Sequence, residues 1–252
     1  MTRTPGPRRP HGGPSPQILR ALLRLREMVV TGELPARGRL PELQLVERVG
    51  VSRTPLRLAM EQLAHEGLLV RRPTGGFVVR EFTLQDVRDA IELRGALEGT
   101  AARLAAERDL STSDREGLVG LVDATDAIVS RPSLTLQSFQ DYLDANQRFH
   151  RRLVALAGNS WLEGVMAQVT SLPFASPSAF VLTQATSPDS QRVLTVAQEH
   201  HRAIADAILR RESARAEVLA REHARLALHY LDSVIRDRER FGRLPGSALV
   251  RL

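Results

Sequence analysis

The amino-acid sequence predicts a mainly α-helical chain, in which an N-terminal winged helix-turn-helix with a small β-hairpin precedes a C-terminal all-α antiparallel helical bundle. Helical spacing of apolar residues dominates the 252 residues, and β-prone runs are confined to residues 68–80. Before residue 80 the predicted elements follow the order helix, short helix, tight turn, helix and hairpin. That order is typical of a winged helix-turn-helix.

The N-terminal part begins with residues 1–15, whose Pro- and Gly-rich composition predicts a disordered arm. The winged helix-turn-helix is predicted over residues 16–80. Gly50 ends its second helix, and Ser52 is placed to cap the third. The predicted elements are a helix from Ile18, a short helix over 42–49, a helix over 52–67 with Pro55 in its first turn, and a hairpin that turns at residues 73–76.

The C-terminal part has almost no β-prone sequence, and its periodicity predicts an all-α domain over residues 81–240. A Pro-, Ser- and Thr-rich break interrupts it at residues 172–188. Residues 241–252 predict a loose C-terminal tail. The predicted helices cover residues 83–108, 111–130, 135–157, 160–171, 189–210 and 212–240.

Composition and charge exclude several classes of protein. There is no cysteine, which excludes disulfides, thiolate metal sites and iron–sulfur clusters. No segment is apolar enough for a membrane span or a signal peptide, so we expect a cytoplasmic protein without a membrane partner. Residues 1–80 contain 14 Arg and 6 Glu, whereas residues 81–252 contain 21 Arg and 23 acidic residues. The basic N-terminal part predicts an anionic partner.

The start of the third predicted helix carries side chains typical of a DNA-reading helix, whose N-terminal residues contact base edges and phosphates. Arginine can form a bidentate contact with guanine, and hydroxyl groups can bind a phosphate or a base. Surface arginines of an ordinary small helical domain are the plainer alternative, but the charge and the element order favour double-stranded DNA. The candidate DNA-binding residues are Ser52, Arg53, Thr54 and Arg57 on the helix and Arg71, Arg72 and Gly75 on the hairpin.

Three histidines, His150, His201 and His223, lie on core-facing stripes of three different predicted helices. A buried imidazole needs a polar partner, and one divalent ion satisfies all three together, with Asn146 as a weaker oxygen ligand. For each histidine alone, a hydrogen-bonded core residue is the simpler alternative, and His200 competes with His201 for the role. A metal-dependent enzyme anchored to DNA is the rival hypothesis; no acidic side chain on these helix faces is an evident general base.

The segment GVSRTPLRLAMEQLAHEGLLVRRPTGGFVV, within residues 17–80, resembles the N-terminal domain of GntR-type bacterial transcription regulators. The resemblance implies that the candidate residues at the start of the helix contact DNA and that Gly75 belongs to the wing. The sequence departs from the family pattern at two positions. Leu58 stands where an acidic residue usually follows the matching arginine, and Leu43 stands where some members have a DNA-contacting arginine.

The segments RDAIELRGALEGTAARLAAE, NQRFHRRLVALAGNSWL and EHHRAIADAILRRESARAEVLAREH resemble the FCD effector domain of the FadR-type branch of this family. Many members bind a metal through an Asp four residues before a His and through two later histidines. The resemblance implies metal ligands at Asn146, His150, His201 and His223, with zinc, nickel and manganese all open as the ion. Asn146 replaces the Asp and leaves the site one unit more positive. The family's effectors are commonly small organic acids.

Arg94 is the candidate effector-binding residue, because its predicted helix face is apolar and a guanidinium suits bidentate recognition of a carboxylate. An ion pair with Glu98, four residues later, is the plainer alternative. We therefore expect a ligand-responsive transcription regulator, not an enzyme, that senses a small carboxylate and binds a near-palindromic operator as a homodimer. A metal-free regulator of a larger, lipid-like effector is the remaining alternative.

Overall fold

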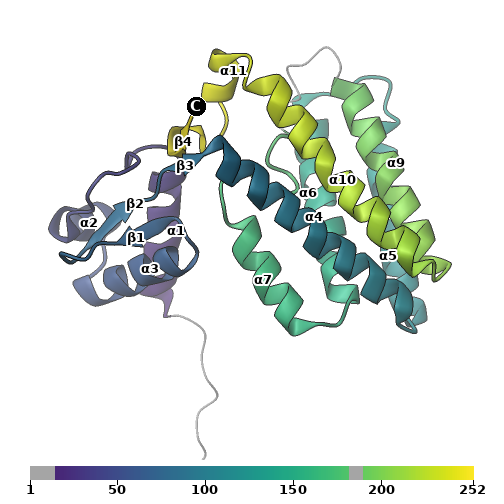
Figure 1. Ribbon diagram of the computed structural model, residues 1–252, viewed down its shortest axis with the longest axis horizontal. Helices are drawn as coiled ribbons and strands as arrows, with labels where there is room; N and C mark the ends of the chain where they lie inside the picture. The colour runs from purple at the N-terminus through teal and green to yellow at the C-terminus, as the bar shows by residue number, and fades with distance from the viewer. Residues whose placement is uncertain (1–14, 182–189) are drawn as a thin grey trace, which may run out of the picture. The chain divides into compact units, whose positions relative to one another are not determined.

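A computed structural model describes residues 15–181 and 190–252 of the chain (Figure 1). It divides into two compact units, residues 1–80 and 81–252. The described residues confirm the mainly α fold class, with one small hairpin in the first unit and a helical second unit. All but the last residue of the predicted N-terminal arm, and residues 182–188 of the predicted break, lie outside the described residues. No helix in the described part is both long and apolar enough to cross a bilayer.

The first unit is organised around a core to which each of its helices contributes fully buried side chains, among them Leu25, Leu45 and Leu56. Gly50 adopts a left-handed conformation, with φ of 69°, and so ends the second helix where the sequence predicted. The elements are α1 (Pro16–Val30), α2 (Glu42–Val49), α3 (Arg53–His65) and the antiparallel strands β1 (Leu69–Arg71) and β2 (Phe77–Val79).

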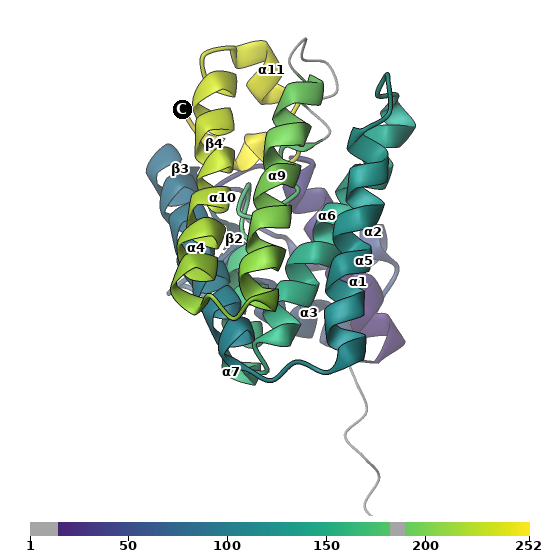
Figure 2. The same cartoon turned by 90° about the vertical axis from the view of Figure 1, so that its right-hand side faces the viewer.

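The second unit is a bundle of long helices (Figures 1 and 2). Side-chain caps begin several of them: Thr83 and Thr135 each form a capping box, and Asn159 accepts from two backbone amides. Its elements are β3 (Phe82–Thr83), α4 (Leu84–Glu107), α5 (Thr112–Val129), α6 (Leu136–Leu156), α7 (Ser160–Thr170), α9 (Ser190–Leu209), α10 (Ser213–Val234), α11 (Arg238–Gly242), a 3-10 helix (Ser247–Leu249) and β4 (Val250–Arg251).

Helices α4 and α10 pack closely side by side, and small residues make this possible (Figures 1 and 2). A Cβ atom added at Gly95 would lie 2.9 Å from the Cβ atom of Ala224, and one added at Gly99 would lie 3.0 Å from the carbonyl oxygen of Glu217. Such contacts leave no room for a larger side chain. The close packing brings Arg94 of α4 to the backbone of α10, where it donates to the Ala224 carbonyl at 3.3 Å.

The C-terminal end of the chain corrects one prediction. The last predicted helix, over 212–240, ends at Val234, and the predicted loose tail over 241–252 is ordered. Phe241, Leu244 and Leu249 are buried, and β4 pairs in parallel with β3. These elements are too short to leave a periodic pattern in the sequence, and burial of their apolar side chains stabilises them.

Candidate DNA-binding surface and histidine cluster

The start of α3 presents polar side chains to solvent on one face and apolar side chains to the core on the other. Arg53, Thr54 and Arg57 are exposed, whereas Leu56 and Met60 are fully buried. The unpaired backbone amides of the first helical turn add a partial positive charge beside these residues. This end of α3 is therefore a basic, exposed surface that suits an anionic ligand.

Ser52 stands at the N-cap position of α3, but its side chain makes no cap hydrogen bond. The sequence suggested that this serine caps the helix, and the structure corrects that suggestion. The exposed hydroxyl remains able to bind a phosphate or a base. Leu58 and Leu43, the two departures from the family pattern, are both exposed on the same unit.

The hairpin, like the start of α3, has an arginine beside a carboxylate of its own unit; on α3 it is Arg57, whose Nε lies 3.8 Å from Glu42 Oε1. Gly75 and Gly76 have positive φ values of 88° and 75°, and the tight turn closes through Arg72, whose backbone amide donates to the Gly76 carbonyl at 3.0 Å. Arg71 forms an ion pair with Glu61 of α3, and its guanidinium lies 5.3 Å from the centre of the Phe77 ring. The Arg71 side chain is thus held against its own domain.

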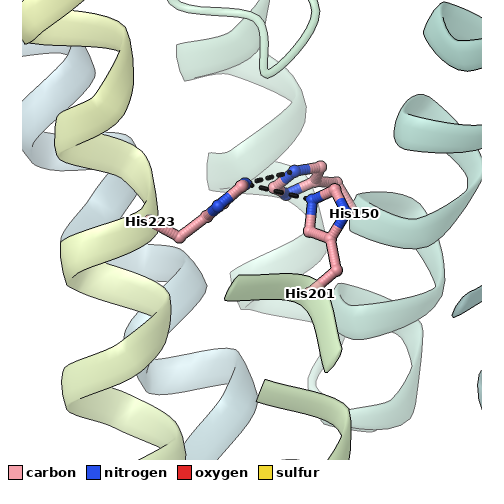
Figure 3. A group of neighbouring side chains, drawn as sticks. All are labelled: His150, His201 and His223. Atoms are coloured by element: carbon pink, nitrogen blue, oxygen red, sulfur yellow. Dashed lines mark hydrogen bonds between the residues drawn. The ribbon is translucent and has the colours of Figure 1, made fainter. Parts of the chain in front are cut away.

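In the second unit, the three predicted histidines come together, one from each of α6, α9 and α10 (Figure 3). The Nε2 atom of His223 lies 3.1 Å from Nε2 of His201 and 3.2 Å from Nε2 of His150. All three are buried: His150 is 4% exposed, His201 0% and His223 8%. His201 rather than the adjacent His200 supplies the nitrogen, although His200 lies beside the His223 ring.

Two further side chains, Gln198 and Glu98, fix the tautomers of His201 and His150. Nδ1 of His201 lies 3.0 Å from Oε1 of Gln198, whose amide nitrogen donates to the Val122 carbonyl at 3.0 Å, so the glutamine oxygen is the acceptor. Nδ1 of His150 lies 2.8 Å from Oε1 of Glu98. Each Nδ1 therefore carries the proton, and both Nε2 lone pairs face the centre of the cluster.

Burial lowers the pKa of His201 and of His223 well below the ordinary value, and the neighbouring imidazoles lower it further. Burial alone raises the pKa of Glu98, but His150 and the Arg94 guanidinium outweigh it and leave that pKa lowered. Glu98 is therefore an ionised carboxylate in the interior, and His201 and His223 are neutral imidazoles able to act as ligands.

The donor set fits a metal ion. Three nitrogens held tetrahedrally at 2.0–2.1 Å from one zinc ion lie about 3.3 Å apart, close to the two contacts that involve His223. Three inward lone pairs repel one another unless a proton on His223 Nε2 or a cation lies between them. His223 Nδ1 is buried without a hydrogen-bond partner. The described His, Cys, Asp and Glu residues that lie close enough to share one ion are these three histidines.

Asn146 and Arg94 line a cavity of about 480 Å³ that also reaches His223, which we name the arginine cavity. Asn146 Nδ2 donates to Ser178 Oγ at 3.0 Å, which leaves the amide oxygen as its free acceptor. Arg94 is 2% exposed; it donates to the Ala224 carbonyl at 3.3 Å, and its Nε has no partner. Tyr142 also lines the cavity with a partnerless hydroxyl, and burial raises its pKa.

Arg94 does not form the ion pair with Glu98 that is the plainer alternative from the sequence. Glu98 lies beside His150 instead, and the ion pairs of the described residues do not include Arg94 with Glu98. Glu98 and Gln198 are the residues that sequence reasoning missed as histidine partners. Local spacing pairs Glu98 with Arg94 on its own helix, and no acidic side chain on the histidine helix faces is an evident general base. Only the packing of α4 against α6 brings it to His150.

Each of the two units matches the model of a known protein family. The model of the family described as bacterial regulatory proteins, gntR family, matches residues 17–79, and the FCD domain model matches residues 89–226. The chain is 30% identical over 162 residues to the regulator YdhC of Bacillus subtilis, covering 63% of this chain and 69% of that protein. It is 29% identical to a probable D-xylose utilization operon transcriptional repressor of Paenarthrobacter nicotinovorans, covering 71% and 73% of the two chains.

Two solved structures share the fold. The Lar protein of Listeria monocytogenes has 19% identity and a TM-score of 0.59, over 85% of this chain and 96% of its own. McbR/YncC of E. coli has 18% identity and a TM-score of 0.59, over 86% and 97% of the two chains. The domain models and the relatives are those of transcriptional regulators rather than of enzymes.

Proposed function

Because this chain belongs to the gntR family of DNA-binding transcriptional regulators and carries an FCD effector domain, we propose how it reads DNA and what it senses. It acts in the cytoplasm as a homodimer on a near-palindromic operator in double-stranded DNA. A divalent metal ion is held by His150, His201 and His223, with Asn146 as a weaker fourth ligand. A small organic acid binds beside that ion and changes the affinity for the operator.

The proposed DNA contacts are of two kinds, contacts in the major groove and contacts with the phosphate backbone. Arg53, Thr54 and Arg57 are exposed at the positive end of α3 and are proposed to enter the major groove, with Ser52 on a phosphate. Gly75 allows the tip of the hairpin to approach the DNA backbone. Arg72 and Arg71 are proposed to bind phosphates, and Arg71 first has to leave Glu61.

The observation that carries the sensing proposal is the convergence of three Nε2 atoms. Glu98 fixes the tautomer of His150, and Gln198 fixes that of His201. Partners of this kind orient the imidazoles that hold a metal ion. A bound zinc, nickel or manganese ion supplies a positive charge that attracts a carboxylate. Asn146, unlike an aspartate, adds no negative charge beside it.

Arg94 is proposed to bind the carboxylate from the other side. Its guanidinium is desolvated, its Nε lacks a partner, and it faces the same cavity as His223. A desolvated guanidinium with a free donor is suited to a charge-assisted hydrogen bond. The partnerless hydroxyl of Tyr142 offers one further donor to the ligand.

A homodimer follows from the symmetry that such an operator requires, because two copies of α3 then enter successive major grooves. The effector changes operator affinity through a coupling that is typically about 1–3 kcal/mol. A test is elemental analysis of the purified protein, followed by a thermal-shift screen of small carboxylates with the metal present and after chelation. Bound metal and stabilisation by carboxylates that disappears after chelation are expected. A metal-free protein that is stabilised by long-chain acyl compounds instead contradicts the proposal.

A further inference from the structure

A second cavity, of about 430 Å³, reaches the histidine cluster from the side of Glu98 and His150. It is lined by Glu98 and His150, and by residues of α6, α7 and the segment that follows α7. The arginine cavity is instead lined by Arg94 and His223, and Pro177 is the one lining residue that the two cavities share. We name this second space the glutamate cavity.

Glu98, one of the residues that line the glutamate cavity, has a carboxylate oxygen without a hydrogen-bond partner. Glu98 is 1% exposed, and its Oε1 lies 2.8 Å from His150 Nδ1, but its Oε2 has no donor. A buried anionic acceptor without a donor costs free energy, so a ligand that supplies a donor there gains affinity. The orphaned oxygen thus indicates which chemical group the cavity suits.

The remaining lining of the glutamate cavity indicates the charge and the body of the ligand. Glu163 adds a second carboxylate, while Arg151 donates to Gln147 on its own helix at 2.8 Å. Two carboxylates and one guanidinium leave one net negative charge, whereas the arginine cavity has three arginines in its wall. The apolar part of the lining consists of Val154, Ala155, Met166, Ala167 and Pro177.

We propose that the glutamate cavity binds a small organic ammonium ion with a short apolar body, which donates a hydrogen bond to Glu98 Oε2. A carboxylate is repelled by the two acidic side chains, and an alcohol offers a donor without a charge. A charged donor to a carboxylate forms the stronger hydrogen bond. The two cavities are therefore specific for ligands of opposite charge.

Binding in the glutamate cavity also affects the histidine cluster, because the ammonium ion and His150 share one carboxylate. A cation at Oε2 draws negative charge away from Oε1 and weakens its attraction for the proton on His150 Nδ1. That attraction raises the basicity of the imidazole toward a metal ion. Where the proposed metal site exists, amine and metal binding oppose each other, and the opposition is reciprocal.

The test uses the full chain without added metal, in the presence of a chelator, so that its outcome does not depend on the proposed metal site. Benzylamine, benzyl alcohol and benzoate have matched bodies and are compared by calorimetric titration. We expect benzylamine to bind at least tenfold more tightly than benzyl alcohol, and benzoate to be excluded from the glutamate cavity. Glu98→Gln is expected to weaken the binding of benzylamine at least tenfold.

Two variants on α7 keep the test independent of any effect of Glu98 on folding. Ala167→Trp fills the cavity from an exposed position and is expected to abolish benzylamine binding, whereas Val165→Trp lies outside the cavity lining and is expected to retain it. Equal binding of the three probes overturns the proposal, as does benzylamine binding that survives both Glu98→Gln and Ala167→Trp. No binding of benzylamine also overturns it and leaves the metal and carboxylate proposal untouched.

Discussion

The two units of the chain differ in where they keep their polar functional groups. In the first unit, Arg53 and Arg57 are exposed and lie within one turn of a single helix. In the second unit, His150, His201 and His223 are buried and come from three helices, with 73 residues separating the first from the last. The geometry of the first group depends on local sequence, while that of the second depends on how distant helices pack.

This difference has an energetic consequence. An exposed arginine keeps its hydration, so its replacement changes stability little, within about 0.5 kcal/mol. A buried imidazole or carboxylate depends on its partners, and removal of one leaves another unpaired at a cost of about 1–3 kcal/mol. Substitutions of the exposed arginines in the first unit are therefore expected to affect DNA binding alone. Substitutions of the buried polar residues in the second unit are expected to affect ligand binding and stability together.

The largest expected effect tests the buried side of this comparison. His201→Ala removes the imidazole that is fully buried and contacts His223, so we expect bound metal to fall from one ion per chain to none. The rise in melting temperature on adding metal is expected to disappear with it, because only a ligand of the folded state stabilises it. Elemental analysis and thermal denaturation measure both quantities.

The matched control for this variant is Arg53→Ala, which is expected to keep its metal. Equal metal content in His201→Ala and the unmodified chain would mean that the cluster is a hydrogen-bonded core rather than an ion site. A loss of metal in both variants would show that the two units are not independent in the way that we infer.

The next effect tests the exposed side. Arg53→Ala is expected to weaken operator binding by about 1–3 kcal/mol, roughly 5- to 150-fold, if the guanidinium contacts a base edge. The melting temperature is expected to stay unchanged, because the side chain is exposed. Fluorescence anisotropy with a DNA fragment selected by the unmodified protein measures the affinity, and Arg148→Ala in the second unit is the control. Unchanged affinity at low and moderate salt contradicts the assignment of α3.

The same contrast explains how far the sequence alone could predict the molecule. The boundaries of α2 and the face of α3 follow from local signals, namely Gly50 and the apolar spacing of Leu56 and Met60. The histidines could be predicted to face the core because helical periodicity reports which side of a helix is buried. The prediction that they converge also required the assumption that the buried faces of the three helices point toward one another.

Contacts between helices are where sequence reasoning failed. Glu98 and Arg94 are four residues apart, so local rules suggest an ion pair between them, yet Glu98 lies against His150 and Arg94 against the Ala224 carbonyl. Periodicity describes one helix at a time and holds no information on which neighbour is within reach. Gln198 was missed for a related reason, because its role depends on the Val122 carbonyl of α5, which the sequence of its own helix does not indicate.

A smaller effect tests how strongly the second unit depends on these partners. Gln198→Leu removes the oxygen that accepts from His201 Nδ1 and keeps a side chain of similar size. The loss of such a partner typically lowers metal affinity about 10- to 100-fold. Competition with a metal-binding dye measures the affinity, and Thr195→Val, at an exposed position of the same helix, is the control. An affinity within twofold of the unmodified chain shows that the tautomer of His201 does not depend on Gln198.

The smallest expected effect is a gain of metal affinity rather than a loss. It tests whether the charge of the buried site favours an anionic ligand. Asn146→Asp places a carboxylate on the wall of the arginine cavity, where its charge attracts a metal ion and repels an acidic ligand. We expect metal affinity to rise about tenfold, which corresponds to about 1.4 kcal/mol. Binding of a small carboxylate is expected to weaken by a similar factor.

The opposite signs make this variant informative, because a simple loss of packing weakens both kinds of binding. The Ser178 hydroxyl donates to the Leu143 carbonyl at 3.4 Å and accepts from Asn146. By turning from that carbonyl to the new carboxylate, it keeps a contact between residues 146 and 178. Ser178→Ala in the Asn146→Asp background is the control for that contact. If metal and carboxylate affinities change in the same direction, Asn146 supports the wall of the cavity and does not set its charge.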